Sequence, residues 1–244
     1  MPRLPRFFIS SDQVTGARII ISGEDVRHIS AVLRMKPGDM LSLCDGQGME
    51  YTVRIVDAGR AEVRTEIVSR SERMPGYPRI ILGQGMPKSD KMDLIVQKAT
   101  ELGVSSIVPI VTERTIVKVR DEEKRVSRWQ KIAREAAMQS NRPDIPLVET
   151  IQAFGAYLPT LKPDPATLFL FPWEEASLPM KHVLQGKTGL KKLVVLIGPE
   201  GGFSAAEAET ATQTGFHSVS LGTNILRTET AAIAALSMIQ YALS

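Results

Sequence analysis

Apolar and polar residues alternate with a period of two in the first part of the chain, a pattern typical of β-strands that bury one face. Turn signals rich in Gly, Pro and Asp separate these short segments. We expect strands over 18–21, 40–44, 50–56 and 61–68. A helix interrupts them and ends at Leu33, having begun near residue 24. This arrangement favours a small β-barrel, and the polar segment 69–78, with its Pro and Gly residues, predicts a linker after it.

From residue 79 onward the pattern changes to short apolar runs that alternate with segments of helical periodicity. The apolar runs predict strands over 79–82, 104–110, 167–171, 193–197 and 217–221. The periodic segments predict helices over 90–102, 121–140, 178–184, 204–214 and 228–243. Gly103 is expected to stop the first of these helices, and Ser204-Ala-Ala-Glu207 matches a capping box that begins another. Consecutive βα units predict an α/β fold, with a mainly parallel sheet and helices on both faces.

Two domains are therefore predicted, a small barrel over 1–72 and a parallel-sheet domain over 73–244. A chain of 244 residues with 43% hydrophobic content is long enough to bury a core in each of them. No apolar run approaches the roughly 20 residues of a membrane span, and the start lacks an apolar signal segment. Cys44 is the only cysteine, so no internal disulfide can form, and we expect a buried structural thiol. These features predict a soluble, cytoplasmic protein without a membrane partner.

The charge of the chain is nearly balanced, with a formal net charge of +3, but its distribution is uneven. Between Arg114 and Arg142 there are nine basic residues and four acidic ones. A solvated helix face and contact with an RNA backbone explain such a run equally well. The three histidines are far apart, and no HxxxH or CxxC spacing occurs, so we expect no metal site.

A glycine motif after the first strand of the second domain, Gly83-Gln-Gly-Met-Pro-Lys88, is similar to the start of a dinucleotide-binding fold. The place of the third glycine is taken by Lys88, although close helix packing requires a very small side chain there. We therefore reject a dinucleotide site. A phosphate-binding loop is also excluded, because no glycine is followed by Lys-Ser or Lys-Thr in the required spacing.

Two motifs near the C-terminus each follow a predicted strand, Ile197-Gly-Pro-Glu-Gly-Gly-Phe203 and Leu221-Gly-Thr-Asn-Ile-Leu-Arg-Thr-Glu-Thr-Ala231. Each also precedes a predicted helix, so both lie at the carboxyl edge of the sheet, where α/β proteins bind small ligands. The glycines of the first motif exceed what a tight turn requires and allow a flat group to lie against the backbone. In the second, Arg227 opens a helix, which is unfavourable unless a substrate phosphate or Glu229 compensates its charge. We expect the two loops to form one pocket.

With these motifs the chain resembles the SPOUT methyltransferases, and within them the ribosomal RNA small subunit methyltransferase E family, which methylates N3 of a uridine in 16S ribosomal RNA. Other similar segments are Arg6-Phe-Phe8, His28 to Arg34 with Gly38-Asp39, Lys98-Ala-Thr-Glu-Leu-Gly103, and Arg128 to Arg142. The resemblance implies a PUA-like barrel that binds RNA and a trefoil-knotted domain that binds S-adenosyl-L-methionine. It also implies a homodimer that acts on ribosomal RNA or on the small ribosomal subunit. The family often has Arg where this chain has Asn224.

The resemblance and the strand-end positions together suggest which residues form the site. We expect the cofactor to contact Leu170, Phe171, Ile197, Gly198, Glu200, Gly201, Leu221, Asn224, Ile225, Leu226 and Thr230. Uridine N3 carries a proton, so the reaction needs a base or a group that stabilises negative charge. Glu229 and Glu200 are candidate bases. Arg227 and Arg142 are candidates for stabilising that charge or for holding a phosphate. Candidate RNA contacts are Arg3, Arg6, His28, Arg34, Lys36, Arg114 and Arg134.

Two other functions stay open at this point. One is a SPOUT methyltransferase that acts on another RNA or on ribose 2′-OH. The other is a non-catalytic RNA-binding factor in ribosome assembly that has kept the fold. The intact glycines, together with Arg227 and Glu229, argue against loss of catalysis. Binding of S-adenosyl-L-methionine would separate an enzyme from a binding module.

Overall fold

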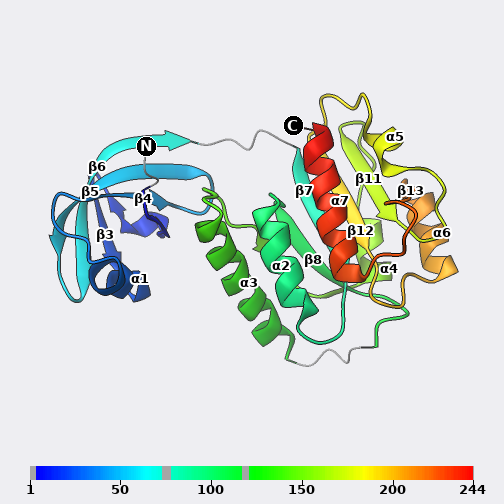
Figure 1. Ribbon diagram of the computed structural model, residues 1–244, viewed down its shortest axis with the longest axis horizontal. Helices are drawn as coiled ribbons and strands as arrows, with labels where there is room; N and C mark the ends of the chain where they lie inside the picture. Colours follow the sequence, from blue (N-terminus) through cyan, green and yellow to red (C-terminus); the bar gives the residue numbers. More distant parts are fainter. Residues whose placement is uncertain (1–3, 73–77, 117–120, 244) are drawn as a thin grey trace. The chain divides into compact units, whose positions relative to one another are not determined.

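The computed structural model describes residues 4–72, 78–116 and 121–243 of the chain. The chain divides into two compact units, which Figure 1 shows. The first unit comprises 1–74 together with 137–145, and the second comprises the rest of the chain. No local pattern in the sequence indicated that 137–145 would group with the first unit. In the described ranges, no helix combines the length and the apolar character needed to cross a bilayer.

The first unit is built on a mixed sheet of six strands in the order β1-β4-β5-β6-β3-β2, which curls around its own core (Figure 1). Its strands are β1 (Arg6–Phe8), β2 (Val14–Thr15), β3 (Arg18–Ser22), β4 (Met40–Cys44), β5 (Met49–Ala58) and β6 (Glu62–Glu72). Side chains alternate between the faces of each strand, so that Ile19, Leu41 and Val53 are buried in one core. The strands predicted from the period-two pattern are all present. In contrast, β1 and β2 are too short to produce such a pattern.

Two details of this unit differ from the sequence prediction. Residues 69–72, predicted as part of a linker, continue β6 because they pair with the start of β5, a contact that no apolar pattern reveals. The linker residues 73–77 lie outside the described residues. The predicted helix over 24–33 consists of α1 (Glu24–Arg27) and a π-helical turn (His28–Val32). In that wider turn, the N–H of Leu33 donates to the carbonyl oxygen of His28, five residues earlier.

Buried polar contacts connect segment 137–145 to the rest of the first unit. Arg6, on β1, forms an ion pair with Glu50 and donates a hydrogen bond to the backbone carbonyl oxygen of Asn141. Only 8% of the Arg6 side chain is exposed. Within the segment, Arg142 forms an ion pair with Asp144. Two residues expected to contact RNA or phosphate, Arg6 and Arg142, therefore have carboxylate partners inside this unit.

Cys44 lies at the end of β4, where it is fully buried beside Phe8 and Ala137. Burial raises the pKa of its thiol to about 11, although the nearby Arg6 opposes this shift. The thiol is therefore neutral near pH 7. The predicted burial of this cysteine is confirmed.

The second unit contains a seven-stranded parallel sheet in the order β10-β8-β7-β12-β11-β13, with β9 beside β8 (Figure 1). Its strands are β7 (Arg79–Gly85), β8 (Ser106–Val111), β9 (Leu147–Val148), β10 (Gln152–Ala153), β11 (Thr167–Pro172), β12 (Lys192–Ile197) and β13 (His217–Val219). Its helices are α2 (Lys91–Glu101), α3 (Glu122–Gln139), α4 (Phe154–Tyr157), α5 (Met180–Leu184), α6 (Ala205–Gln213) and α7 (Thr228–Leu243). A 3-10 turn follows α4 at Leu158–Thr160. The predicted α/β class and the parallel sheet are confirmed.

Helices cover both faces of this sheet. On one face, α4 and α6 pack over Val194 and Leu196 of β12, with Phe203 between them. The neighbouring β12 residues Leu193 and Val195 point to the opposite face, where α7 packs against β12 and α2 packs against α7. Each face of the sheet is therefore buried, which explains why the strands are continuous apolar runs.

Local sequence signals explain several element ends in this unit. Gly103 stops α2 with a φ of 85°, a conformation that glycine adopts without strain. Ser204 and Glu207 form the predicted capping box at the start of α6. The two-residue strands β9 and β10 were not predicted, because so short a segment has no periodicity.

Strand β7 is longer than predicted, because it continues through Gly83 to Gly85. A Cβ at Gly83 would lie 2.5 Å from a methyl carbon of Leu196, and one at Gly85 would lie 2.6 Å from the backbone nitrogen of Pro199. Both glycines are therefore needed for β7 to approach the end of β12. The glycine motif therefore has a packing role in this fold.

Candidate functional site

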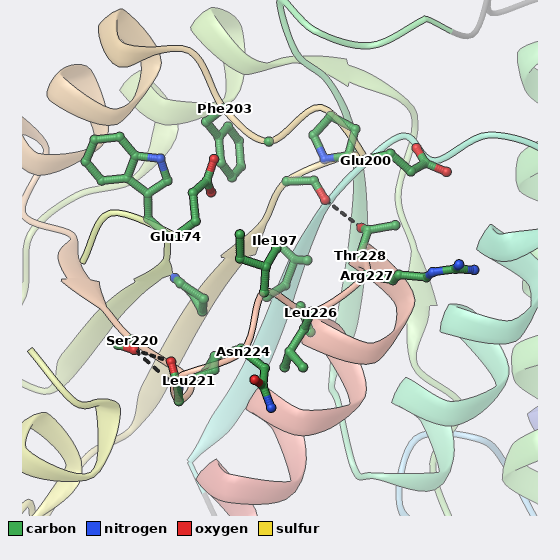
Figure 2. A pocket seen from close by; sticks show the side chains of 18 of the residues that line it. Glu174, Ile197, Glu200, Phe203, Ser220, Leu221, Asn224, Leu226, Arg227 and Thr228 are labelled. Carbon is green, nitrogen blue, oxygen red and sulfur yellow. Dashed lines mark hydrogen bonds between the residues drawn. The ribbon is translucent and has the colours of Figure 1, made fainter. Parts of the chain in front are cut away.

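A cavity of about 390 Å³ lies at the carboxyl edge of the parallel sheet (Figure 2). The loop after β12 contributes residues 197–203 to its lining, and the loop after β13 contributes 220–228. Residues 172–174, at the end of β11, and Ala231 complete the lining. The pocket expected between the two C-terminal motifs is therefore present.

Glycine gives the loop after β12 its shape. Gly202 has a φ of 67°, in the left-handed region that favours glycine. A Cβ at this position would lie 3.0 Å from a carboxylate oxygen of Glu174, so the bare backbone allows this carboxylate to approach. In Figure 2, Glu174 and Phe203 lie on the opposite side of the cavity from Leu221 and Asn224. A carboxylate and an aromatic ring therefore lie on one side of the cavity, and the loop after β13 lies on the other.

Buried hydrogen bonds connect the two loops behind the cavity. The hydroxyl of Thr228, the first residue of α7, donates to the carbonyl oxygen of Gly198 (Figure 2). The same hydroxyl oxygen accepts a hydrogen bond of 2.9 Å from the side-chain amide of Gln84, on β7. Gln84 is fully buried and also donates to the carbonyl oxygen of Gly85. Strand β7 therefore supports both walls, although it does not line the cavity.

Three charged side chains gather beside the cavity. Lys91 Nζ, in the first turn of α2, lies 2.9 Å from Glu200 Oε1 and 3.3 Å from Glu229 Oε2. The backbone N–H of Lys88 also donates to the Glu200 carboxylate, at 3.1 Å. Burial opposes ionisation of Glu200, but the hydrogen bonds from Lys91 and the backbone outweigh it and lower the pKa of this carboxyl group. Hydrogen bonding to Glu200 in turn raises the pKa of Lys91, which therefore stays charged.

Arg227 lines the cavity from the residue that precedes α7, and its side chain is exposed. The sequence allowed Glu229 to compensate its charge, but Glu229 pairs with Lys91 instead. Within the described part of the chain, no carboxylate forms an ion pair with Arg227. In Figure 2 the guanidinium of Arg227 and the carboxylate of Glu200 both project to one side, away from Leu221. Arg227 is thus a cation available to a bound anion.

Several of the predicted cofactor residues lie on the cavity wall. These are Ile197, Gly198, Glu200, Gly201, Leu221, Asn224, Ile225 and Leu226. Leu170 and Phe171 are fully buried within β11 and are not part of the lining. Thr230 is exposed in the first turn of α7, also outside the lining. Ile225 is 87% exposed, an unusual state for an isoleucine at the edge of a cavity.

Sequence reasoning missed four residues of this site: Gln84, Lys91, Trp173 and Glu174. Trp173 and Glu174 follow β11 directly, so the strand-end rule that found the two motifs could also have found them. Gln84 carries no such signal, because a glutamine in a strand has an ordinary structural explanation. Lys91 opens α2, where a cation is unfavourable, so the argument applied to Arg227 could also have found it.

The remaining candidate RNA contacts of the first unit occupy its surface. His28 is exposed in the π-helical turn, and its ring packs edge-on against Phe7 with 5.5 Å between ring centroids. Arg34 and Lys36 are exposed, and Arg34 has a φ of 52°, which is uncommon outside glycine. Arg3 lies outside the described residues. The exposed side chains are available to an RNA backbone.

In the second unit, Arg114 lies next to the cavity, because its guanidinium donates to the carbonyl oxygen of Gly201 at 3.0 Å. The Arg114 side chain also packs against this loop, since a Cβ at Gly201 would lie 3.2 Å from the Cβ of Arg114. Arg134 is exposed on α3. Residues 117–120, part of the basic run, lie outside the described residues.

Comparison with known proteins agrees with this architecture. Residues 75–240 match the family model of an RNA methyltransferase domain, and residues 21–68 match that of an RNA methyltransferase PUA domain. The chain is therefore of the RNA methyltransferase class, with a PUA domain preceding the methyltransferase domain.

The relatives identify the group within this class. The chain is 32% identical to ribosomal RNA small subunit methyltransferase E of Bacillus subtilis (strain 168), over 98% of this chain and 96% of the relative. It is 32% identical to the structure of that enzyme from Neisseria gonorrhoeae bound to S-adenosyl methionine, with a TM-score of 0.86 over 98% of each chain. A methyltransferase structure from Legionella pneumophila, in complex with the cofactor SAM, is 33% identical, with a TM-score of 0.85 over 98% of each chain. This chain belongs to the ribosomal RNA small subunit methyltransferase E family, as its motifs suggested.

Proposed function

We propose that this protein transfers a methyl group from S-adenosyl-L-methionine to N3 of a uridine in 16S ribosomal RNA. The observation that carries the proposal is the cavity between the two C-terminal loops, in a chain whose relatives include structures bound to this cofactor. Because ribosomal RNA is the proposed substrate, we place the protein in the cytoplasm.

The chemistry of the cavity suits this cofactor, which combines a flat base, a ribose and a cationic methionine part. A volume of about 390 Å³ falls within the usual range of small-molecule sites, roughly 300 to 1,000 Å³. Ile197, Leu221 and Leu226 offer apolar surface to the base. The carboxylates of Glu174 and Glu200 favour a cation over a phosphate.

We assign the cofactor contacts to the two loops. Gly198 and Gly201 present bare backbone on one wall, and Asn224 and Ile225 lie on the other. Leu170, Phe171 and Thr230 stay in the proposal as residues beside the site. When bound, the cofactor supplies a methyl group on a sulfonium centre, which an aligned nucleophile displaces in line.

Two residues at the start of α7 are assigned to the uridine. Transfer forms a bond between N3 and the methyl carbon, breaks the bond from that carbon to sulfur, and requires N3 to lose its proton. Glu229 is the proposed proton acceptor, because its buried Oε2 lies 3.3 Å from the Lys91 ammonium and accepts no other hydrogen bond within the described residues. Glu200 is the weaker candidate, since its lowered pKa makes it a poorer base. Arg227 stabilises the negative charge that develops on the uracil oxygens.

We further propose that 1–72 forms the RNA-binding domain and 73–244 the methyltransferase domain, which the matched ranges support. The exposed candidates His28, Arg34, Lys36, Arg114 and Arg134 would contact ribosomal RNA or the small subunit. Arg142 would hold a phosphate of the RNA once its ion pair with Asp144 opens.

A homodimer is also proposed. On α7, Met238 is exposed and Tyr241 is 89% exposed. Leu94 is exposed on α2, the helix that packs against α7. An apolar surface of this kind favours a second protein surface over water. Light scattering on the purified chain would give the mass of the assembly.

Nucleoside mass spectrometry tests the proposed reaction. The purified protein is incubated with methyl-labelled S-adenosylmethionine and small subunits that lack base methylation, and the digested RNA is analysed. We expect label in 3-methyluridine. Label in a 2′-O-methyl nucleoside would replace the proposed target, and cofactor binding without any label would support a non-catalytic factor.

A further inference from the structure

The charged cluster beside the cavity joins three separate segments of the second unit. Glu200 belongs to the loop after β12, Glu229 to the first turn of α7, and Lys91 to the first turn of α2. The Lys91 ammonium lies at ion-pair distance from both carboxylates, at 2.9 Å and 3.3 Å. All three side chains are partly exposed to water, with exposures of 29% for Lys91, 26% for Glu200 and 16% for Glu229. One ammonium is thus shared by Glu200, which lines the cavity, and Glu229, which lies outside the lining in the first turn of α7.

The segment that carries Lys91 contacts both walls at further points. The backbone N–H of Lys88 donates to Glu200, and Gln84 donates to Thr228, which in turn donates to Gly198. No residue of 84–91 lines the cavity itself. This segment therefore acts on the cavity from behind, by holding the groups that form it.

We propose that Lys91 is a positioning residue, which fixes the spacing of the two cavity walls and the orientation of Glu229 by holding Glu200 and Glu229 on one ammonium. The inference rests on the proposed function, because it concerns the geometry in which cofactor and uridine meet. Lys91 acts through the two carboxylates and does not touch the reacting atoms.

The charges explain why a cation is required at this point. Without Lys91, two neighbouring carboxylates would repel each other in a partly buried space, and no other side chain among the described residues forms an ion pair with both Glu200 and Glu229. Single exposed ion pairs contribute little to folding stability, so the expected effect is on geometry rather than on the fold. A misplacement of about 1 Å at a reacting centre lowers turnover on the order of 100-fold.

Two substitutions and one matched control test the proposal. Lys91→Met removes the charge and keeps most of the side-chain length, whereas Lys91→Arg keeps the charge. The control is Lys98→Met, on the same helix. Lys98 Nζ lies 2.8 Å from Glu101 Oε1, and neither residue lines the cavity. For each variant we would measure calorimetric binding of S-adenosylmethionine, kcat and KM with small subunits, and the unfolding temperature. Fluorescence of Trp173, which lines the cavity, gives a second readout of binding.

We expect Lys91→Met to bind S-adenosylmethionine about 10-fold more weakly and to lower kcat on the order of 100-fold, with KM for the RNA substrate within about twofold. Lys91→Arg should recover most of both losses, and Lys98→Met should match the wild type. Unchanged binding and kcat in Lys91→Met would overturn the proposal. The proposal would also be overturned if Lys91→Met and Lys91→Arg lost cofactor binding and kcat equally and both showed a large fall in unfolding temperature. A purely structural role of Lys91 predicts that pattern. If the wild type binds no cofactor, the proposed function fails, independently of what Lys91 does.

Discussion

The close approach of β7 to the cavity loop makes Gly85→Ala a sharp test of the packing described above. A Cβ at Gly85 would lie 2.6 Å from the backbone nitrogen of Pro199 and 2.9 Å from the carbonyl carbon of Gly198. Ordinary van der Waals contact begins near 3.4 Å, so the strand and the loop must separate by about 0.8 Å. Backbone atoms cannot rotate out of the way as a side chain can. The substitution therefore moves the wall of the cavity.

The expected magnitude follows from that displacement. Overpacking of a close-packed interior costs about 1 to 3 kcal/mol. For a unit of this size, that corresponds to a fall of about 2 to 12 °C in unfolding temperature. Because Gly198 lines the cavity, we also expect binding of S-adenosylmethionine to weaken about 10-fold and turnover to fall further.

Thermal unfolding and titration calorimetry would measure both effects. The matched control is Gly155→Ala, because a Cβ at Gly155, in α4, would have no atom within 4 Å. Alanine is preferred to glycine in a helix by roughly 0.5 to 1 kcal/mol, so this control should be neutral or slightly stabilising. If Gly85→Ala left the unfolding temperature and the cofactor affinity equal to those of the control, the proposed packing of β7 against the loop would be refuted.

Three further predictions concern single groups. Arg227→Ala should lower kcat on the order of 100-fold with unchanged cofactor affinity, because the developing charge loses its cation; full turnover with unchanged RNA affinity would remove Arg227 from the site. Thr228→Val should lower the free energy of unfolding in urea by about 1 to 3 kcal/mol, since it removes one of the two acceptors of the Gln84 amide and the donor to the carbonyl of Gly198, whereas Thr228→Ser should retain most of the stability. Burial raises the pKa of Cys44 from 9.0 to about 11. The contribution of this thiol to the free energy of unfolding is therefore fully present below pH 9 and is lost as the pH rises toward 11. Denaturant titrations across that range should show a decline that Cys44→Ala lacks; an equal decline in both proteins would contradict the assignment.

The fold was largely predictable because its elements have strong local patterns. The apolar runs of β11 and β12 and the capping box at Ser204 are visible in the sequence itself. The position of the pocket followed from the same information, because loops at the carboxyl ends of neighbouring parallel strands meet at one edge. Non-local contacts had no such signal. Neither the grouping of 137–145 with the first unit nor the sharing of Lys91 between two carboxylates follows from any short window of sequence.

The same limit explains what became of the arginines. Arg6 and Arg142 looked like free cations in the sequence, but each has a carboxylate partner in the fold, and that partner is set by tertiary structure. Arg227 showed the opposite result, since Glu229, one of the two partners that the sequence allowed for it, pairs with Lys91 instead. Which charges stay available to a ligand therefore depends on packing that a linear pattern does not contain.

The contribution of 137–145 to the first unit bears on how the chain is made and how it can be cut. During synthesis the N-terminal sheet emerges early, yet the carbonyl of Asn141 that Arg6 requires and the Ala137 that covers Cys44 arrive only later. A fragment truncated at residue 72 would lack Ala137, which packs against Cys44. It would also lack the carbonyl oxygen of Asn141, so the buried Arg6 guanidinium would lose one of its hydrogen-bond acceptors. We therefore expect the first unit to be stable only when it is expressed with the whole chain, because residues 137–145 belong to it.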